Sequence, residues 1–157
     1  MTYAIVLAAG IGQRMQSDQP KQFLDLAGAP LLIHTLDAFE ACEGVDAIVV
    51  VTGSDDTDAV ASLVDGYAKV RVVVTGGKER QDSVAEGLKA VPSDADLIAV
   101  HDGARPLILP TEIDAVLYVI LKRMRARAVF TNIRPKWSIP GRGSLLSLLA
   151  ELFRRRR

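Results

Sequence analysis

The amino-acid sequence predicts an α/β domain in which a mostly parallel sheet carries helices on both faces. Two observations support this prediction. Aliphatic residues dominate, and aromatic residues make up only 5% of the 157 residues, a balance that suits a helix-layered sheet better than an all-β sandwich. Short apolar runs also alternate with segments of helical spacing along the chain. The length is sufficient for one domain with a substantial core.

Four apolar runs are predicted to be strands. The first, Tyr3–Ala9, is continuously apolar, as expected of a central parallel strand that is buried on both faces. The segment that follows it, Gly10–Pro20, is rich in glycine and polar residues and is expected to be a loop or a short helix. The other predicted strands are Val45–Thr52, Val70–Thr75 and Leu97–His101.

Four helices are predicted between and after these strands. Leu31, Leu32, Leu36 and Phe39 recur at helical spacing, with Pro30 near the start of that segment. The predicted helices are Pro30–Ala41, Asp55–Gly66, Arg80–Val91 and Pro110 to about Leu121. Strands separated by helices of this length imply βαβ units and a Rossmann-like parallel sheet.

The charge of the chain divides it into two parts. Residues 1–121 contain 8 Lys+Arg and 18 Asp+Glu, whereas residues 122–157 contain 11 Lys+Arg and a single acid, Glu151. The formal charge therefore changes from −10 to +10, although it is zero over the whole chain. We accordingly predict a domain at 1–121 and a basic, atypical C-terminal segment at 122–157, in which residues 128–133 could form a strand and residues 144–153 a short helix.

Composition also bears on the compartment. Cys42 is the sole cysteine, so no disulfide can form within the chain; we expect a buried thiol and a reducing, cytoplasmic setting. No run approaches the 18 or more apolar residues of a membrane span. The apolar N-terminal run lacks a basic leader and a cleavage pattern, so no signal peptide is expected.

Two motifs lie near the first predicted strand. LAAGIGQRM (Leu7–Met15) places glycines directly after the strand, where backbone N–H groups can approach a phosphate. It fits neither the dinucleotide fingerprint nor the P-loop pattern, and alone it indicates little more than a tight turn. Lys21, within PKQF, together with Arg14 could neutralise a triphosphate and its charged transition state.

Two further motifs follow later strands. GGKERQDSV (Gly76–Val84) is either a turn followed by a helix, or a segment that places backbone amides and Ser83 against a base or ribose. VHDGARP (Val100–Pro106) puts Asp102 at the end of the fourth predicted strand, where it could be a turn residue or a Mg²⁺ ligand. Because parallel strands present their carboxyl ends at one edge of a sheet, we expect all four motifs to gather there.

In this order and spacing, the four motifs resemble the 2-C-methyl-D-erythritol 4-phosphate cytidylyltransferases over roughly residues 3–121. The resemblance implies a nucleotidyltransferase-like fold and transfer of CMP from CTP to the phosphate of a small polyol. It implies release of pyrophosphate, Mg²⁺ as cofactor, a homodimer, and a place in the non-mevalonate synthesis of isoprenoid precursors.

Site residues follow from the resemblance by position. Arg14 and Lys21 match the cations that stabilise the α-phosphate, and Asp102 matches a Mg²⁺ ligand. Lys78 stands where an aspartate is common. The positions that match nucleotide-binding residues are Ala8, Ala9, Gly10, Gly12, Gly77, Arg80, Ser83, Gly103, Ala104 and Arg105.

The resemblance ends where the charge changes sign. The family's later polyol-binding segments and dimerising arm have no counterpart in residues 122–157, so we expect a sheet without the family's last strands, with exposed edges that favour aggregation. A shifted reading frame or a fused tail would explain the switch. Three alternatives stay open: a ribitol-phosphate or other sugar-phosphate nucleotidylyltransferase, a non-catalytic nucleotide-binding remnant, and, least favoured, a nucleic-acid contact through the basic tail.

Overall fold

The computed structural model describes residues 1–10 and 20–125. The chain divides into two units, Met1–Lys122 and Arg123–Arg157, and the description that follows concerns the first. The strand and helix expected at residues 128–133 and 144–153 lie outside the described residues. The division at residue 121 therefore stays a prediction.

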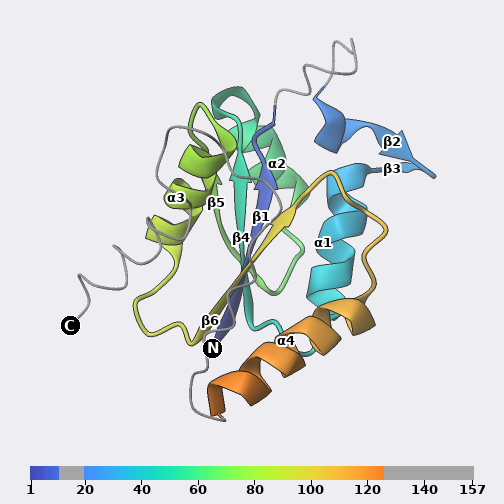
Figure 1. Cartoon of the computed structure of the whole chain (residues 1–157). Helices are drawn as coiled ribbons and strands as arrows, with labels where there is room; N and C mark the ends of the chain where they lie inside the picture. The colour runs from blue at the N-terminus through green and yellow to red at the C-terminus, as the bar shows by residue number, and fades with distance from the viewer. Residues whose placement is uncertain (11–19, 126–157) are drawn as a thin grey trace, which may run out of the picture. The chain divides into compact units, whose positions relative to one another are not determined.

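The centre of the first unit is a four-stranded parallel sheet with the order β5-β4-β1-β6 (Figure 1). The strands are β1 (Thr2–Ala8), β4 (Ala47–Thr52), β5 (Val70–Thr75) and β6 (Leu97–Asp102). Every predicted strand is present within two residues of its expected start, and the parallel α/β fold is confirmed. The strand that comes first in the sequence lies between β4 and β6, which agrees with its continuous apolar run.

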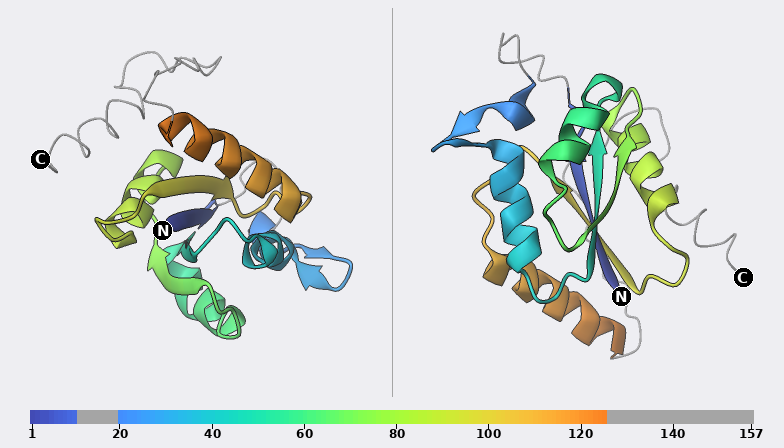
Figure 2. Two further views of the ribbon diagram at one scale, coloured as in Figure 1. Left: turned by 90° about the horizontal axis from the view of Figure 1, so that it is seen from below. Right: turned by 180° about the vertical axis from the view of Figure 1, so that it is seen from behind.

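Alternate residues of the central strands supply two cores. Ala4 and Val6 of β1 face one side of the sheet, where they pack with helices α1, α2 and α4, whereas Ile5 and Leu7 face the other side, where they pack with α3. Figure 2 shows α3 separated by the sheet from α1 and α4. Helices on both faces were predicted, and this is confirmed.

The helices are α1 (Leu31–Ala41), α2 (Thr57–Leu63), α3 (Arg80–Ala90) and α4 (Pro110–Arg125). Helix α2 is shorter than predicted because a 3-10 turn, η2 (Ser54–Asp56), precedes it and Val64 ends it. Helix α4 continues four residues past the predicted end at Leu121. Within the described residues, no helix combines the length and hydropathy that a membrane span requires.

One feature between β1 and α1 was not predicted. A 3-10 turn, η1 (Lys21–Phe23), leads into a two-stranded hairpin of β2 (Asp25–Leu26) and β3 (Ala29–Pro30). Its two central residues, Ala27 and Gly28, have φ of 54° and 93°, as a tight hairpin turn requires. The hairpin and η1 place Lys21 near the carboxyl ends of the strands.

Candidate functional site

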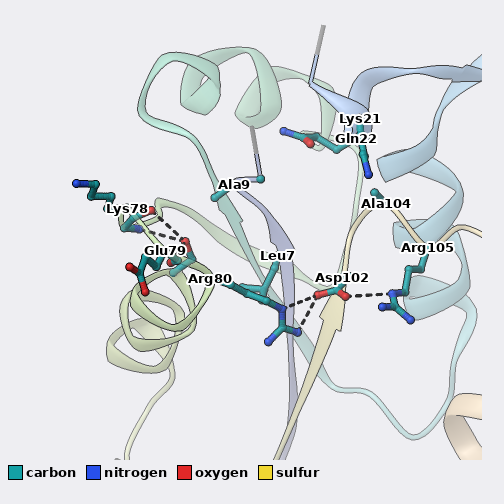
Figure 3. A pocket seen from close by; sticks show the side chains of 13 residues that line it. Leu7, Ala9, Lys21, Gln22, Lys78, Glu79, Arg80, Asp102, Ala104 and Arg105 are labelled. Carbon is teal, nitrogen blue, oxygen red and sulfur yellow. Dashed lines mark hydrogen bonds and ion pairs between the residues drawn. The ribbon is translucent and has the colours of Figure 1, made fainter. Parts of the chain in front are cut away.

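A cavity of about 410 Å³ opens at the carboxyl ends of β1 and β6 (Figure 3). Its volume lies within the range of sites for small ligands. All four sequence motifs contribute to its lining, as expected from the sheet topology. The lining residues are Leu7, Ala9, Gly10, Lys21, Gln22, Gly77, Lys78, Glu79, Arg80, Ser83, Asp102, Ala104 and Arg105.

The connection from β5 to α3 forms one wall, and its glycines are required by close packing. A Cβ on Gly76 would lie 2.6 Å from the Ser83 Oγ, and one on Gly77 would lie 2.3 Å from the Asp82 Cβ. The Gly77 N–H donates to the Ser83 Oγ at 3.2 Å, so Ser83, which is buried, holds the turn at the start of α3. The Glu79 N–H donates to Asp82 Oδ2 at 3.1 Å and caps the same helix end.

The loop after β6 forms the opposite wall. The Gly103 N–H donates to the Leu7 carbonyl at 2.7 Å, and the Gly103 carbonyl accepts from the buried Thr35 Oγ1 at 2.9 Å. A Cβ on Gly103 would lie 3.0 Å from Leu32 Cδ1 and from the Leu7 carbonyl oxygen. Strand β1 and helix α1 thus fix the backbone that presents Asp102 to the cavity.

Two arginines hold the Asp102 carboxylate. The Nε and one terminal nitrogen of Arg80 donate to Asp102 Oδ1 at 3.0 and 2.8 Å, and the Arg105 Nε lies 3.0 Å from Oδ2. Arg80 reaches Asp102 from the first turn of α3, whereas Arg105 comes from the loop after β6 (Figure 3). We call these three residues the Asp102 clamp. It leaves the Asp102 side chain 32% exposed.

Further cations lie around the cavity. Lys21, from η1, points toward Ala104, whereas Lys78 extends away from the Asp102 clamp (Figure 3). Lys21, Lys78, Arg80 and Arg105 outnumber the two lining carboxylates, Glu79 and Asp102, so the cavity has a net positive charge, which suits a polyphosphate ligand.

The structure brings most of the predicted site residues together at the cavity. Ala8 and Gly103 are instead buried beside it, in β1 and against Leu32. Gly12 and Arg14 lie outside the described residues. Four lining residues within the motifs were not predicted to be site residues: Leu7, Gln22, Lys78, which was noted only as a departure from the family's aspartate, and Glu79. Membership of a quoted motif was the signal that could have identified them.

Among the described residues, no group of three or more His, Cys, Asp or Glu side chains is placed to hold a metal ion. To bind a metal ion, Asp102 would therefore need further oxygen ligands from a bound molecule. Cys42 is fully buried as predicted, and burial together with its hydrogen bond to Asp114 raises the pKa of the thiol to about 11. A thiol with this pKa is a poor nucleophile, so Cys42 is a packing residue.

Comparison with known proteins gives a consistent result. Residues 2–134 match the model of the 2-C-methyl-D-erythritol 4-phosphate cytidylyltransferase family, so the match continues past residue 121. A curated protein of that name from Clostridium botulinum (strain Langeland / NCTC 10281 / Type F) is 47% identical over 106 residues, 66% of this chain and 46% of the relative. Another from Pelotomaculum thermopropionicum is 45% identical over 117 residues, 73% of this chain and 49% of the relative.

Solved structures agree with the fold. A 4-diphosphocytidyl-2C-methyl-D-erythritol synthase from Anaerococcus prevotii aligns with a TM-score of 0.60 at 31% identity, covering 80% of this chain and 49% of the other. A nucleotidyl transferase from Methanothermobacter thermautotroptrophicus aligns with a TM-score of 0.60 at 28% identity, covering 75% and 57%. The chain spans about half the length of the curated relatives that it matches.

Proposed function

The chain belongs to the 2-C-methyl-D-erythritol 4-phosphate cytidylyltransferase family, and on that premise we propose that its cavity binds CTP with Mg²⁺. The reaction is attack by the phosphate of a small polyol, 2-C-methyl-D-erythritol 4-phosphate, on the α-phosphate of CTP. CMP is transferred and pyrophosphate leaves. The setting that we propose is the cytoplasm.

The observation that carries this proposal is the charge distribution in the cavity. Four cations, Lys21, Lys78, Arg80 and Arg105, line the cavity with two carboxylates, Glu79 and Asp102. A triphosphate and the charge that develops as pyrophosphate leaves need such cations more than they need a covalent catalyst. The attacking phosphate is already ionised, so the reaction needs no general base.

The donor set at Asp102 fits Mg²⁺ on one condition. Mg²⁺ in nucleotide sites is bound by one or two carboxylates together with substrate phosphates and water. Asp102 offers one carboxylate that is partly exposed to the cavity, so the phosphates must supply further oxygens. When bound there, the ion would neutralise charge on the phosphates.

We assign the remaining residues by position. Lys21, with Arg14, stabilises the α-phosphate during transfer. The backbone around Ala8–Gly10 and Gly12 surrounds the phosphates, and the turn at Gly77 with Ser83 lies against the base and ribose. The loop Gly103–Arg105 completes the nucleotide site.

The experiment is a thermal-shift measurement on the full chain with CTP and Mg²⁺, against ATP, GTP and UTP. A ligand that binds only the folded state stabilises it by about 2.7 kcal/mol at 100 times its Kd, so we expect a shift selective for CTP. Pyrophosphate release is then measured with 2-C-methyl-D-erythritol 4-phosphate and with ribitol 5-phosphate.

Each outcome separates the candidate functions. Release with the first polyol supports the proposal, whereas preference for ribitol 5-phosphate assigns the chain to the related activity. A CTP-selective shift without pyrophosphate release identifies a nucleotide-binding protein without catalysis. A chain that unfolds cooperatively but is stabilised by no nucleotide would contradict both cytidylyl transfer and nucleotide binding.

A further inference from the structure

The Asp102 clamp occupies both oxygens of the carboxylate that the proposed function gives to Mg²⁺. Arg80 donates twice to Oδ1, and Arg105 contacts Oδ2. Two guanidinium groups beside a carboxylate repel an approaching divalent cation and compete for the same oxygens. The two arginines therefore weaken the binding of a metal ion that arrives alone at this carboxylate.

The same two arginines are suited to a second partner. A guanidinium group binds phosphate oxygens with the same fork geometry that it uses for a carboxylate. The side chains of Arg80 and Arg105 are 52% and 73% exposed, and exposed ion pairs of this kind are weak. A ligand with several charges can take the arginines from Asp102 at little cost.

Both arginines stand on backbone that is already fixed. Arg80 begins α3, whose first turn is capped by the Glu79 N–H to Asp82 bond. The Arg105 N–H donates to the Asp102 carbonyl at 3.1 Å, and the Arg105 carbonyl lies 3.3 Å from His101 Nε2. An exchange of partners therefore needs rotation of side chains but no movement of the backbone.

We propose that Arg80 and Arg105 hold Asp102 in the nucleotide-free protein and pass to the phosphate oxygens when a nucleotide binds, which releases the carboxylate to a divalent cation. The inference rests on the proposed function and adds to it. It makes Arg80 and Arg105 positioning residues that couple nucleotide binding to metal binding. Arg80 thereby acts on the phosphates and on the Asp102 carboxylate.

The exchange of partners predicts that one substitution, Asp102→Asn, raises the affinity for CTP without metal and lowers it with Mg²⁺. Without metal, in EDTA, CTP must compete with Asp102 for the arginines, so Asp102→Asn should tighten CTP binding by about fivefold or more, the lower end of typical coupling between sites. With Mg²⁺, the same variant loses a ligand of the metal and should bind CTP more weakly than the wild type. Both affinities are measured by calorimetry on the full chain.

A mutant cycle separates the clamp from simple repulsion between Asp102 and the phosphates. If the clamp acts, Asp102→Asn should tighten metal-free CTP binding by less than about twofold in an Arg80→Gln/Arg105→Gln background, because no arginine remains to be released. Simple repulsion would leave the fivefold effect intact. Lys89→Gln is the matched control: it removes an α3 cation whose partner is Glu86, and the fivefold effect should persist in it.

A second readout uses the wild-type side chains directly. The Nε–H signals of Arg80 and Arg105 in nitrogen-15 NMR spectra, assigned with the two Gln variants, should move on addition of CTP in EDTA and should move in Asp102→Asn without nucleotide. Signals that respond to neither change would overturn the clamp even if a variant fails to fold.

The outcomes distinguish the inference from the proposed function. CTP binding with Mg²⁺ but no tightening by Asp102→Asn in EDTA overturns the clamp and leaves the function standing. Equal affinity for UTP and CTP, with the cycle as predicted, contradicts cytidylyl transfer and leaves the clamp standing. Failure of every variant and of the wild type to bind nucleotide overturns both.

Discussion

Lys21 is the described residue to which we assign a direct role at the reacting phosphate. Removing one preorganised group that stabilises a developing charge typically costs a factor of about 100 to 1,000 in kcat. We therefore expect Lys21→Ala to lower kcat by about 100-fold with a smaller effect on CTP affinity, measured by pyrophosphate release and calorimetry. The control is Lys89→Gln, which should retain wild-type kcat. A raised KM with unchanged kcat would instead assign Lys21 to ground-state binding.

Asp114 gives the fold a dependence on pH. Its Oδ1 accepts from the Cys42 thiol at 3.0 Å and from the Gly44 N–H at 2.8 Å, and these bonds lower the pKa of the carboxyl below its usual 3.8. Because the pKa of Asp114 is lower in the folded protein than in the unfolded chain, its ionised carboxylate stabilises the fold at pH values above the unfolded-state pKa. This stabilisation is lost as the pH falls through the folded-state pKa and the carboxylate is protonated. Asp114→Asn should cost about 1 kcal/mol at pH 7.

The difference between wild type and Asp114→Asn should shrink when urea unfolding is repeated near pH 3. Asp65→Asn, an exposed position after α2, is the control and should change stability little at either pH. A gap between wild type and Asp114→Asn that stays constant from pH 7 to 3 would show that the charge of Asp114 does not contribute.

At the scale of elements, helix α3 depends on Gly87 for its distance from the sheet. A Cβ at this position would lie 2.7 Å from Ile5 Cγ2 and 2.9 Å from Val51 Cγ2. Gly87→Ala should therefore destabilise the protein by about 1–3 kcal/mol, the usual cost of overpacking a core, despite the better helix propensity of alanine. The free energy of unfolding in urea measures the effect.

Gly66→Ala is the matched control, because a Cβ there meets nothing within 4 Å, and its unfolding free energy should stay close to wild type. The shift of α3 in Gly87→Ala should also weaken CTP binding, since Arg80 and the Gly77 turn stand at the start of that helix. Equal unfolding free energies of the two variants would mean that α3 and the sheet can accommodate the added methyl group without loss of stability.

Elements with a strong pattern could be predicted from the sequence, and those that depend on local conformation could not. The apolar runs of β1 and β4 and the helical spacing of α1 identify buried layers directly. The β2–β3 hairpin was missed because Ala27-Gly28 lacks the Asn-Gly signal that marks such turns. The Asp102 clamp could not be predicted either, because the fold brings Arg80 to Asp102, and spacing along the chain does not encode that contact.

At the scale of the whole molecule, α4 exposes apolar side chains within the part of the chain that the structure describes. Ile113 and Leu117 are buried, whereas Val116, Tyr118 and Val119 are 61%, 62% and 51% exposed. Exposed apolar patches promote association. The paired substitution Val116→Lys/Val119→Lys should lower the concentration-dependent light scattering of the full chain while changing the unfolding free energy by no more than about 0.5 kcal/mol.

The control for this substitution is Ala59→Lys/Ala61→Lys, which adds the same charge at exposed positions of α2. That variant should scatter light as the wild type does. If both pairs of lysines suppress scattering equally, net charge rather than the α4 surface governs association.

The place of β1 between β4 and β6 has a consequence for the timing of folding. Tyr3 pairs with Ala47, and Thr2 pairs with Leu97, so β1, which is synthesised before the other three strands of the sheet, receives its second neighbour last. At 5–20 residues per second, that wait is roughly 5 to 20 seconds. Pairing of strands that are this far apart in the sequence is slow, because the entropy of the long intervening loop is lost before the stabilising contacts form. A nascent chain of this topology therefore keeps one edge of β1 unpaired for seconds after β4 has been made, long enough for a chaperone to bind there before β6 does.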